Sequence, residues 1–394
     1  DHLKISREKL AYLVDSTAAP VAGVAIISTW IAAEIGYIND AFDKLGLAER
    51  VNGFDIFVQT IPYRFYALLA LVFVPMVALL GRDFGAMLKA ERKARLTDGT
   101  KPNVKPTSNV TPARASHWLN AVLPIVTMLA VTTVLLFMTG LEAVAFGETS
   151  FYNVFSSGNS YIALLYGSLA GLLTAVLMTI LQKLMSLKEL AKAVRDGAKT
   201  VLLALAILWL AWTLSGITTK EHLGTDVYLG GLLQGNVPIQ LMPTLVFVLA
   251  SFVAFATGTS WGTMGILMPL AVRVTYTMLQ GDNSAVSPSD PIMLASVGSV
   301  LAGAIFGDHC SPISDTTVVS SQASGCDHMA HVWTQLPYAL VVGAVAILCG
   351  TLPIGFGVSV WVLLPLGVLV LFVFLRLVGR RVEDDNSTLG AAQE

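Results

Sequence analysis

Long runs without a charged residue dominate the chain. They cover 159–182, 200–219, 227–272 and 332–375. A helix that spans a membrane needs only about 20 residues, so the two longest runs each hold two spans, or one span and a re-entrant piece. Run lengths and turn residues predict about ten helical segments. They lie near 16–38, 61–81, 117–140, 159–183, 198–217, 238–257, 263–280, 290–306, 334–356 and 358–379.

The predicted fold is an all-α polytopic membrane protein with about ten transmembrane segments, some of them discontinuous. Composition agrees, since 55% of the 394 residues are hydrophobic and 13% are charged, whereas about a quarter of an average soluble chain is charged. The net charge of −2 gives no reason to expect a nucleic-acid partner; the basic residues instead face the lipid bilayer. The three cysteines form no regularly spaced disulfide framework.

Basic residues concentrate in alternate loops and thereby predict the orientation. The 82–114 loop contains eight Lys and Arg, the 183–199 loop contains five, and three Arg follow the last span, whereas 141–158 and 282–289 have none. The positive-inside rule places the basic loops in the cytoplasm. We therefore expect an inner (cytoplasmic) membrane location with both termini of the chain cytoplasmic.

A polar segment divides the chain. Residues 97–116 contain three prolines, a composition typical of a linker. This cytoplasmic linker separates the first transmembrane segments and their cytoplasmic loop, 1–96, from a main transmembrane bundle, 117–381, and a polar tail, 382–394. In 184–199 the basic residues share one helical face, which predicts an interfacial helix.

The candidate chemistry centres on the sequence GDHCSPISDTT at 307–317. Ionisable groups at membrane depth cost at least a few kcal/mol each, so Asp308 and Asp315 indicate a functional site. Pro312 interrupts any helix that passes through and frees carbonyl oxygens. Oxygen ligands at a broken helix suit a small hard cation. The predicted neutral ligands are Ser311, Ser314, Thr316 and Thr317.

Both carboxylates also have a structural interpretation. Asp315, followed by Thr316, has the residue type of a helix N-cap, and the other acid could pair with Arg273. At intramembrane depth, two purely structural carboxylates within one broken segment are the less favoured interpretation.

A second interruption, TGTSWGT at 257–263, contains two glycines and four hydroxyls. It is either a second discontinuous helix, whose Thr257, Thr259 and Ser260 join the same ion, or a close helix contact or turn.

Other polar residues leave alternatives open. Glu34 and His309 are candidates for titrating groups, although a histidine satisfied within the core is an equal alternative. The sequence CDHMAH at 326–331 offers soft metal ligands, against the interpretation that it is a polar cytoplasmic rim.

These motifs resemble the NhaC-type sodium/proton antiporter family. The similarity rests on 307–317 and 257–263, and also on DSTAAP at 15–20, IPYRFY at 61–66, GRDFGAM at 81–87, CDH at 326–328 and QLPY at 335–338. The chain resembles the later two-thirds of a longer transporter. The acidic Ser-Pro motif typical of an earlier half has no second copy here; only the short echo of 315–317 in 15–17 is present.

The predicted function is a secondary antiporter that exchanges Na⁺, and also Li⁺, for H⁺ by alternating access and so serves pH homeostasis. Asp308 and Asp315 bind the cation when ionised and a proton when it leaves. No organic cofactor is implied, no metal site is assigned, and a homodimer is compatible with the sequence.

One alternative is a Na⁺- and H⁺-coupled exchanger of small carboxylates of the malate/lactate type, with Arg64 or Arg273 as the anion site. A remote alternative is an intramembrane metal-dependent enzyme that uses Asp308, His309, Cys310 and His328.

Overall fold

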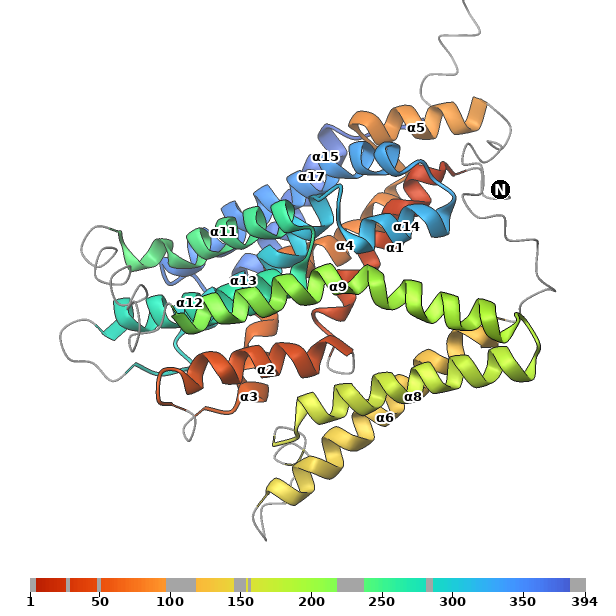
Figure 1. Ribbon diagram of the computed structural model, residues 1–394. Coiled ribbons are helices and arrows are strands. Elements are labelled where there is room, and N and C mark those ends of the chain that lie inside the picture. The colour runs from red at the N-terminus through yellow and green to blue at the C-terminus, as the bar shows by residue number, and fades with distance from the viewer. Residues whose placement is uncertain are drawn as a thin grey trace, which may run out of the picture.

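Figure 1 shows the protein as a computed structural model that is almost entirely helical. It describes residues 5–25, 29–47, 51–96, 118–144, 154, 157–217, 237–280 and 286–382. The two strands within these ranges, β1 (Arg82–Asp83) and β2 (Arg380–Arg381), form one short antiparallel pair. The all-α class predicted from the sequence is confirmed. The predicted linker 97–116 and all but Val382 of the predicted tail lie outside the described residues.

The first part of the chain forms short helices separated by breaks. They are α1 (Arg7–Ala22), α2 (Thr29–Asp43), α3 (Gly53–Thr60), a 3-10 turn (Ile61–Tyr63), α4 (Phe65–Leu80) and α5 (Gly85–Leu96). The predicted single span 16–38 is wrong, because α1 ends at Ala22 and α2 begins at Thr29. The Gly23 carbonyl, left without a helical partner at this end, accepts a hydrogen bond from Arg64.

The middle of the chain forms a hairpin of α6 (Leu119–Ala143) and α8 (Ser160–Leu181), which lies beside the rest of the bundle in Figure 1. A Cβ at Gly167 would overlap the Thr132 hydroxyl, so this glycine lets the two helices approach closely. In an apolar 18-residue stretch of either helix, only 11% of the residues are buried. Their outer faces are therefore suited to lipid.

The next helix, α9 (Leu187–Ile217), is one continuous helix of 31 residues. It unites the predicted interfacial helix at 184–199 with the predicted span at 198–217, so the expectation of two separate helices is wrong. The Glu189 carboxylate accepts hydrogen bonds from the backbone N–H and the hydroxyl of Ser186, both at 2.8 Å. This capping box fixes the start of the helix, and nothing in the following residues stops it.

The remaining helices form the main bundle. They are α11 (Met242–Thr257), α12 (Ser260–Gln280), α13 (Pro291–Cys310), α14 (Asp315–Ser324), α15 (His328–Ala346), a π-helical turn (Ile347–Thr351), α16 (Leu352–Gly355) and α17 (Val360–Leu377). In an apolar 18-residue stretch of α13, 83% of the residues are buried. This makes α13 the central helix. A Cβ at Gly303 would come within 2.6 Å of the Phe247 carbonyl oxygen, and one at Gly307 would overlap the Ser251 carbonyl. Glycine at both positions thus permits α13 to pack directly on α11.

Six helices in the described part of the chain are long and apolar enough to cross a membrane, or seven if the bent pair 53–63 and 65–80 is one span. The break in that pair, at Arg64, turns the chain by 51°. All ten predicted segments coincide with helices, although 16–38 is divided between two and 198–217 is part of α9. The chain is a multi-pass membrane protein.

Candidate functional site

The predicted break around Pro312 separates α13 from α14. Helix α13 ends at Cys310, Ser311 is extended, and α14 begins at Asp315. The Ser311 amide donates to the Asp308 carbonyl at 3.0 Å, which closes the last turn. The Ser311 hydroxyl donates to the Phe255 carbonyl at 2.8 Å. The broken segment is therefore held against the end of α11.

Asp308 lies in the last turn of α13 and is only 3% exposed. The Thr316 hydroxyl donates to its Oδ2 at 3.2 Å, and the Ser314 and Thr316 hydroxyls are 3.0 Å apart. Because both hydroxyls come from the start of α14, the break folds back and brings three predicted ligands together. Asp15 and Asp315 lie near enough to Asp308 for their negative charges to act on it.

Asp15, which was not among the predicted site residues, is a second buried carboxylate of this site. It lies on α1, is 1% exposed, and accepts hydrogen bonds from Thr317 at 3.0 Å, Ser320 at 3.2 Å and Gln335 at 2.7 Å. These donors come from α14 and α15, so the Asp15 carboxylate ties α1 to both helices. The sequence feature that could have identified Asp15 is an acidic residue within an apolar segment, at the start of the DSTAAP motif.

His309 lies beside these acids, and both of its ring nitrogens have partners. Nε2 is 3.0 Å from the Ser16 hydroxyl and 4.0 Å from Asp15 Oδ2, and Nδ1 is 2.6 Å from the Tyr66 hydroxyl. The Gln335 amide that donates to Asp15 also donates to the His309 carbonyl at 2.7 Å. These contacts match the structural alternative, a core histidine with satisfied nitrogens, and they join α1, α4, α13 and α15.

Asp315 occupies a different position from Asp308. It is exposed and is the first residue of α14. The N-cap is Ser314, not Asp315, so the proposed capping role of Asp315 is wrong. Arg273, the suggested structural partner of Asp308, donates to the Lys44 carbonyl at 2.9 Å.

The second predicted interruption, at 257–263, meets the first. Gly258 ends α11 in the left-handed conformation at φ +67°, and a Cβ there would lie 2.7–2.9 Å from Ile313 atoms. The Thr257 hydroxyl donates to the Val253 carbonyl at 2.8 Å, and Thr259 Oγ1 accepts from the Gly262 amide at 3.4 Å. These two hydroxyls are thus used within their own segments, while Ser260 is buried.

Replacing Gly258 with Ala should destabilise the protein by about 2–5 kcal/mol. The left-handed backbone costs roughly 1–2 kcal/mol with a Cβ, and overpacking against Ile313 adds about 1–3 kcal/mol. Thermal unfolding in detergent measures the effect. Gly197→Ala is the matched control, because among the described residues a Cβ there meets no atom within 4 Å. Equal stability of the two variants would contradict a close contact between the two breaks.

Glu34 and Arg64 form a separate ion pair, in which both side chains are fully buried. Arg64 Nη1 lies 2.6 Å from Glu34 Oε2, and Nη2 donates to the Thr60 hydroxyl at 3.1 Å. The guanidinium also lies over the Phe57 ring. Glu34, a candidate for a titrating group, thus belongs to a clamp between α2, α4 and the end of α1.

The two histidines of CDHMAH, His328 and His331, form hydrogen bonds with residues of the site. His328 Nε2 lies 2.6 Å from the Pro312 carbonyl oxygen, and His331 Nε2 lies 2.8 Å from Gln335 Oε1. Both Nδ1 atoms face the Ser321 hydroxyl, at 3.1 and 2.8 Å. Over the described residues, no three His, Cys, Asp or Glu side chains are arranged to hold a metal ion. All three cysteines are free.

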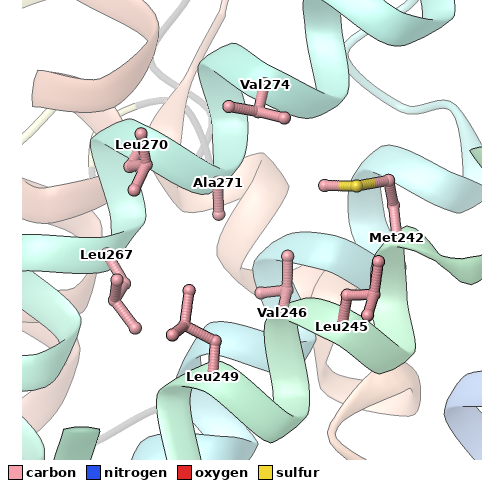
Figure 2. A pocket seen from close by; sticks show the side chains of 8 residues that line it. All are labelled: Met242, Leu245, Val246, Leu249, Leu267, Leu270, Ala271 and Val274. Carbon is pink, nitrogen blue, oxygen red and sulfur yellow. The ribbon is translucent and has the colours of Figure 1, made fainter. Parts of the chain in front are cut away.

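A groove of about 230 Å³ between α11 and α12 is shown in Figure 2. Its lining is entirely aliphatic or thioether. The residues are Met242, Leu245, Val246, Leu249, Leu267, Leu270, Ala271 and Val274. It offers no oxygen ligand, so a cation site is better sought at Asp308 and Asp15.

The chain is similar to several known proteins. It is 34% identical over 369 residues to an uncharacterised protein of Haemophilus influenzae, which covers 91% of this chain and 66% of that protein. It is 36% identical over 117 residues to an uncharacterised Na⁺/H⁺ antiporter of the same organism, covering 29% of this chain and 22% of the relative. It is 28% identical over 228 residues to a malate-2H⁺/Na⁺-lactate antiporter of Bacillus subtilis, covering 52% and 46%. The chain thus spans 66% or less of the length of these relatives. No solved structure matches it.

The family profile described as the Na⁺/H⁺ antiporter family matches residues 21–353. That range includes both breaks, Asp308 and the Glu34–Arg64 pair. It confirms the resemblance seen in the motifs. The chain therefore belongs to the Na⁺/H⁺ antiporter family.

Proposed function

We propose that the protein is a secondary active antiporter that exchanges Na⁺ for H⁺ across the cytoplasmic membrane by alternating access. The observation that supports this most is the pair of buried acids, Asp308 and Asp15, surrounded by hydroxyls where α13 is broken. Charges at such depth are costly and are typical of ion and proton pathways. A carboxylate with neutral oxygens is also the ligand set of a hard cation.

In this proposal Na⁺ and H⁺ compete for the same carboxylate oxygens. Ionised Asp308 attracts Na⁺, and the hydroxyls of Ser314 and Thr316 complete the coordination from the start of α14. When Na⁺ leaves, a proton neutralises Asp308 and lowers the cost of its burial. Asp15 is held by three donors and supplies a second negative charge. Of the other predicted ligands, exposed Asp315 fits an outer position, and Ser311, Thr317, Thr257, Thr259 and Ser260 stay predictions.

We also propose an orientation for the chain in the membrane. The Arg-containing ends of α4 and α17 lie side by side, because β1 pairs with β2. Both ends then face the same compartment. The positive-inside rule places the basic residues that follow each of these two helices in the cytoplasm, which agrees with a shared compartment. This agreement supports a cytoplasmic position for the two ends. We also propose that the protein exchanges Li⁺ and forms a homodimer.

A second candidate cargo is a small organic ion. The relatives named as a malate-2H⁺/Na⁺-lactate antiporter and, in Halobacterium salinarum, an arginine/ornithine antiporter motivate it. An organic anion needs a positive charge in the pocket, but Arg64 is neutralised by Glu34 and Arg273 binds the Lys44 carbonyl. These contacts disfavour an organic anion such as malate or lactate.

The test is a pH-gradient dequenching assay with the chain in proteoliposomes. Addition of Na⁺ or Li⁺ should collapse the gradient, whereas K⁺, malate and lactate alone should not. A response that requires malate or lactate would overturn the proposal in favour of the carboxylate exchanger.

The apparent affinity for Na⁺ should weaken as pH falls, by up to about tenfold per pH unit for each proton displaced. The sign follows from competition, because protonation removes the charge that binds Na⁺. The measurement is the half-saturating Na⁺ concentration over a pH series in the same vesicles. A half-saturation point that is constant through the active pH range would contradict a shared site.

A further inference from the structure

The first turns of α1 lead from the buried acid Asp15 toward the β1–α5 segment. Lys9 and Tyr12 precede Asp15 on the same helix. Neighbours in this series are three residues apart, so each is adjacent to the next on the helix surface. In the proposed orientation this end of α1 is cytoplasmic, because β1 and α5 belong to the basic 82–114 loop. Lys9 and Tyr12 therefore lie on the cytoplasmic side of Asp15.

The ring of Tyr12 covers His309, the neighbour of Asp308. The two rings are nearly parallel, with centroids 6.5 Å apart, and the Tyr338 ring meets Tyr12 edge-on at 5.0 Å. Tyr338 is stacked in turn on Phe84, at 4.3 Å. Tyr12 and Tyr338 are only 2% and 1% exposed. These three packed rings of Tyr12, Tyr338 and Phe84, here called the aromatic layer, join the site to the β1–α5 segment.

An ion pair holds the aromatic layer in place. Lys9 Nζ lies 2.8 Å from Asp83 Oδ2, and the Tyr338 hydroxyl donates to Asp83 Oδ1 at 2.8 Å. The Asp83 side chain is fully buried, whereas that of Lys9 is 10% exposed. A buried carboxylate is costly without its cation. The pair therefore favours the arrangement in which α1, β1 and α15 stay together.

The start of α1 is also attached to α5. Glu91 accepts hydrogen bonds from the amide and the hydroxyl of Ser6, at 2.8 and 2.6 Å. The Ser6 hydroxyl accepts in turn from the Lys9 amide at 3.1 Å, as the N-cap of α1. Water can replace the partner of each of these polar groups, because hydrogen bonds made in folding exchange with hydrogen bonds to water. The contact between α1 and α5 is thus suited to open and close.

We propose that the aromatic layer and the Lys9–Asp83 pair together form a gate that closes the cytoplasmic route to the buried acids. The inference rests on the proposed function, since alternating access requires a site that is closed on one side at a time. The gate is shut in this structure. Opening parts Lys9 from Asp83, moves the Tyr12 ring off His309 and admits water to the site.

The native thiol of Cys310 reports whether the gate is open. Cys310 follows His309, is 6% exposed, and lies near enough to Asp15 and Asp308 for their charges to act on it. The measurement is its rate of reaction with a cationic, water-soluble methanethiosulfonate reagent. It uses the full chain in detergent, with the other two cysteines changed to Ser, and mass spectrometry to count the modified protein.

Lys9→Met should raise the Cys310 rate by about tenfold or more, because Asp83 is then a buried carboxylate without its cation and the open arrangement lets water solvate it. Adding Asp83→Asn removes that charge and keeps an acceptor for the Tyr338 hydroxyl. The double variant should therefore return the rate to within about twofold of the starting protein.

Tyr12→Leu is a second, independent variant. It removes the ring over His309 but keeps an apolar side chain. The loss of ring contacts with both neighbours should again raise the Cys310 rate by about tenfold.

The matched control is Cys349, which lies in the π-helical turn. In a protein that keeps only this cysteine, Lys9→Met and Tyr12→Leu should leave the rate unchanged. A selective rise at Cys310 in either variant supports the gate. No rise in either variant, or a rise that Cys349 matches in both, would overturn it. None of these rates involves transport, so a chain whose Cys310 responds as expected but that exchanges no Na⁺ for H⁺ would contradict the proposed function alone.

Discussion

Replacing Asp308 with Asn is expected to reduce Na⁺/H⁺ exchange to the background of protein-free vesicles. The amide keeps the size of the side chain but loses its charge and its titrating proton. Changes in groups that merely support a metal ligand cost about 10–100-fold in affinity, so loss of the charged ligand itself should cost more than about 100-fold. Dequenching assays at saturating Na⁺ provide the measurement.

The matched control is Asp327→Asn. Asp327 is exposed and is the N-cap of α15, where it accepts from the Ala330 amide at 2.8 Å. Asn is an equally good cap, so folding and exchange should both be retained. Equal loss in the two variants, at equal amounts of folded protein, would mean that Asp308 is not the transport carboxylate.

Replacing Arg64 with Met is expected to lower the free energy of unfolding by about 3–5 kcal/mol, because it leaves Glu34 as an uncompensated buried charge. Adding Glu34→Leu removes that charge and should restore most of the loss, since an apolar pair of similar volume is often neutral. Thermal unfolding in detergent, followed by tryptophan fluorescence, measures both.

The partly exposed ion pair of Lys44 with Asp40 provides the comparison for Arg64. Its charges are one helical turn apart and in contact with solvent, so Lys44→Gln should cost only about 0.3–0.5 kcal/mol. A small effect of Arg64→Met, or no rescue by the second change, would show that the buried pair does not hold the helices together.

The helical class and the break at Pro312 could be predicted because they depend on local sequence. Apolar run length predicts helices, and a proline within such a run predicts an interruption. The break inside 16–38 was missed because it occurs at Gly23, in a stretch that stays apolar on both sides. What stabilises it is Arg64, 41 positions away in the sequence.

The composition of the site could be predicted only in part, for a similar reason. Asp308, Ser314 and Thr316 come from one motif, so their proximity followed from the sequence. Asp15 reaches its Thr317 partner across 302 positions, a pairing that depends on how α1 packs against α14. The echo of 315–317 in 15–17 was the one visible sign, and it suggested similarity of motif without indicating contact.

The two buried acids belong to different parts of the bundle. Asp308 is on α13, which is locked to α11 through Gly303, Gly307 and the Ser311 contact. Asp15 is on α1, and its donors come from α14 and α15. The two parts are nevertheless linked, because the Gln335 amide donates both to Asp15 and to the carbonyl of His309, the residue after Asp308. A shift of α1 relative to α13 therefore has to break a hydrogen bond of this one amide, which couples the surroundings of the two carboxylates mechanically.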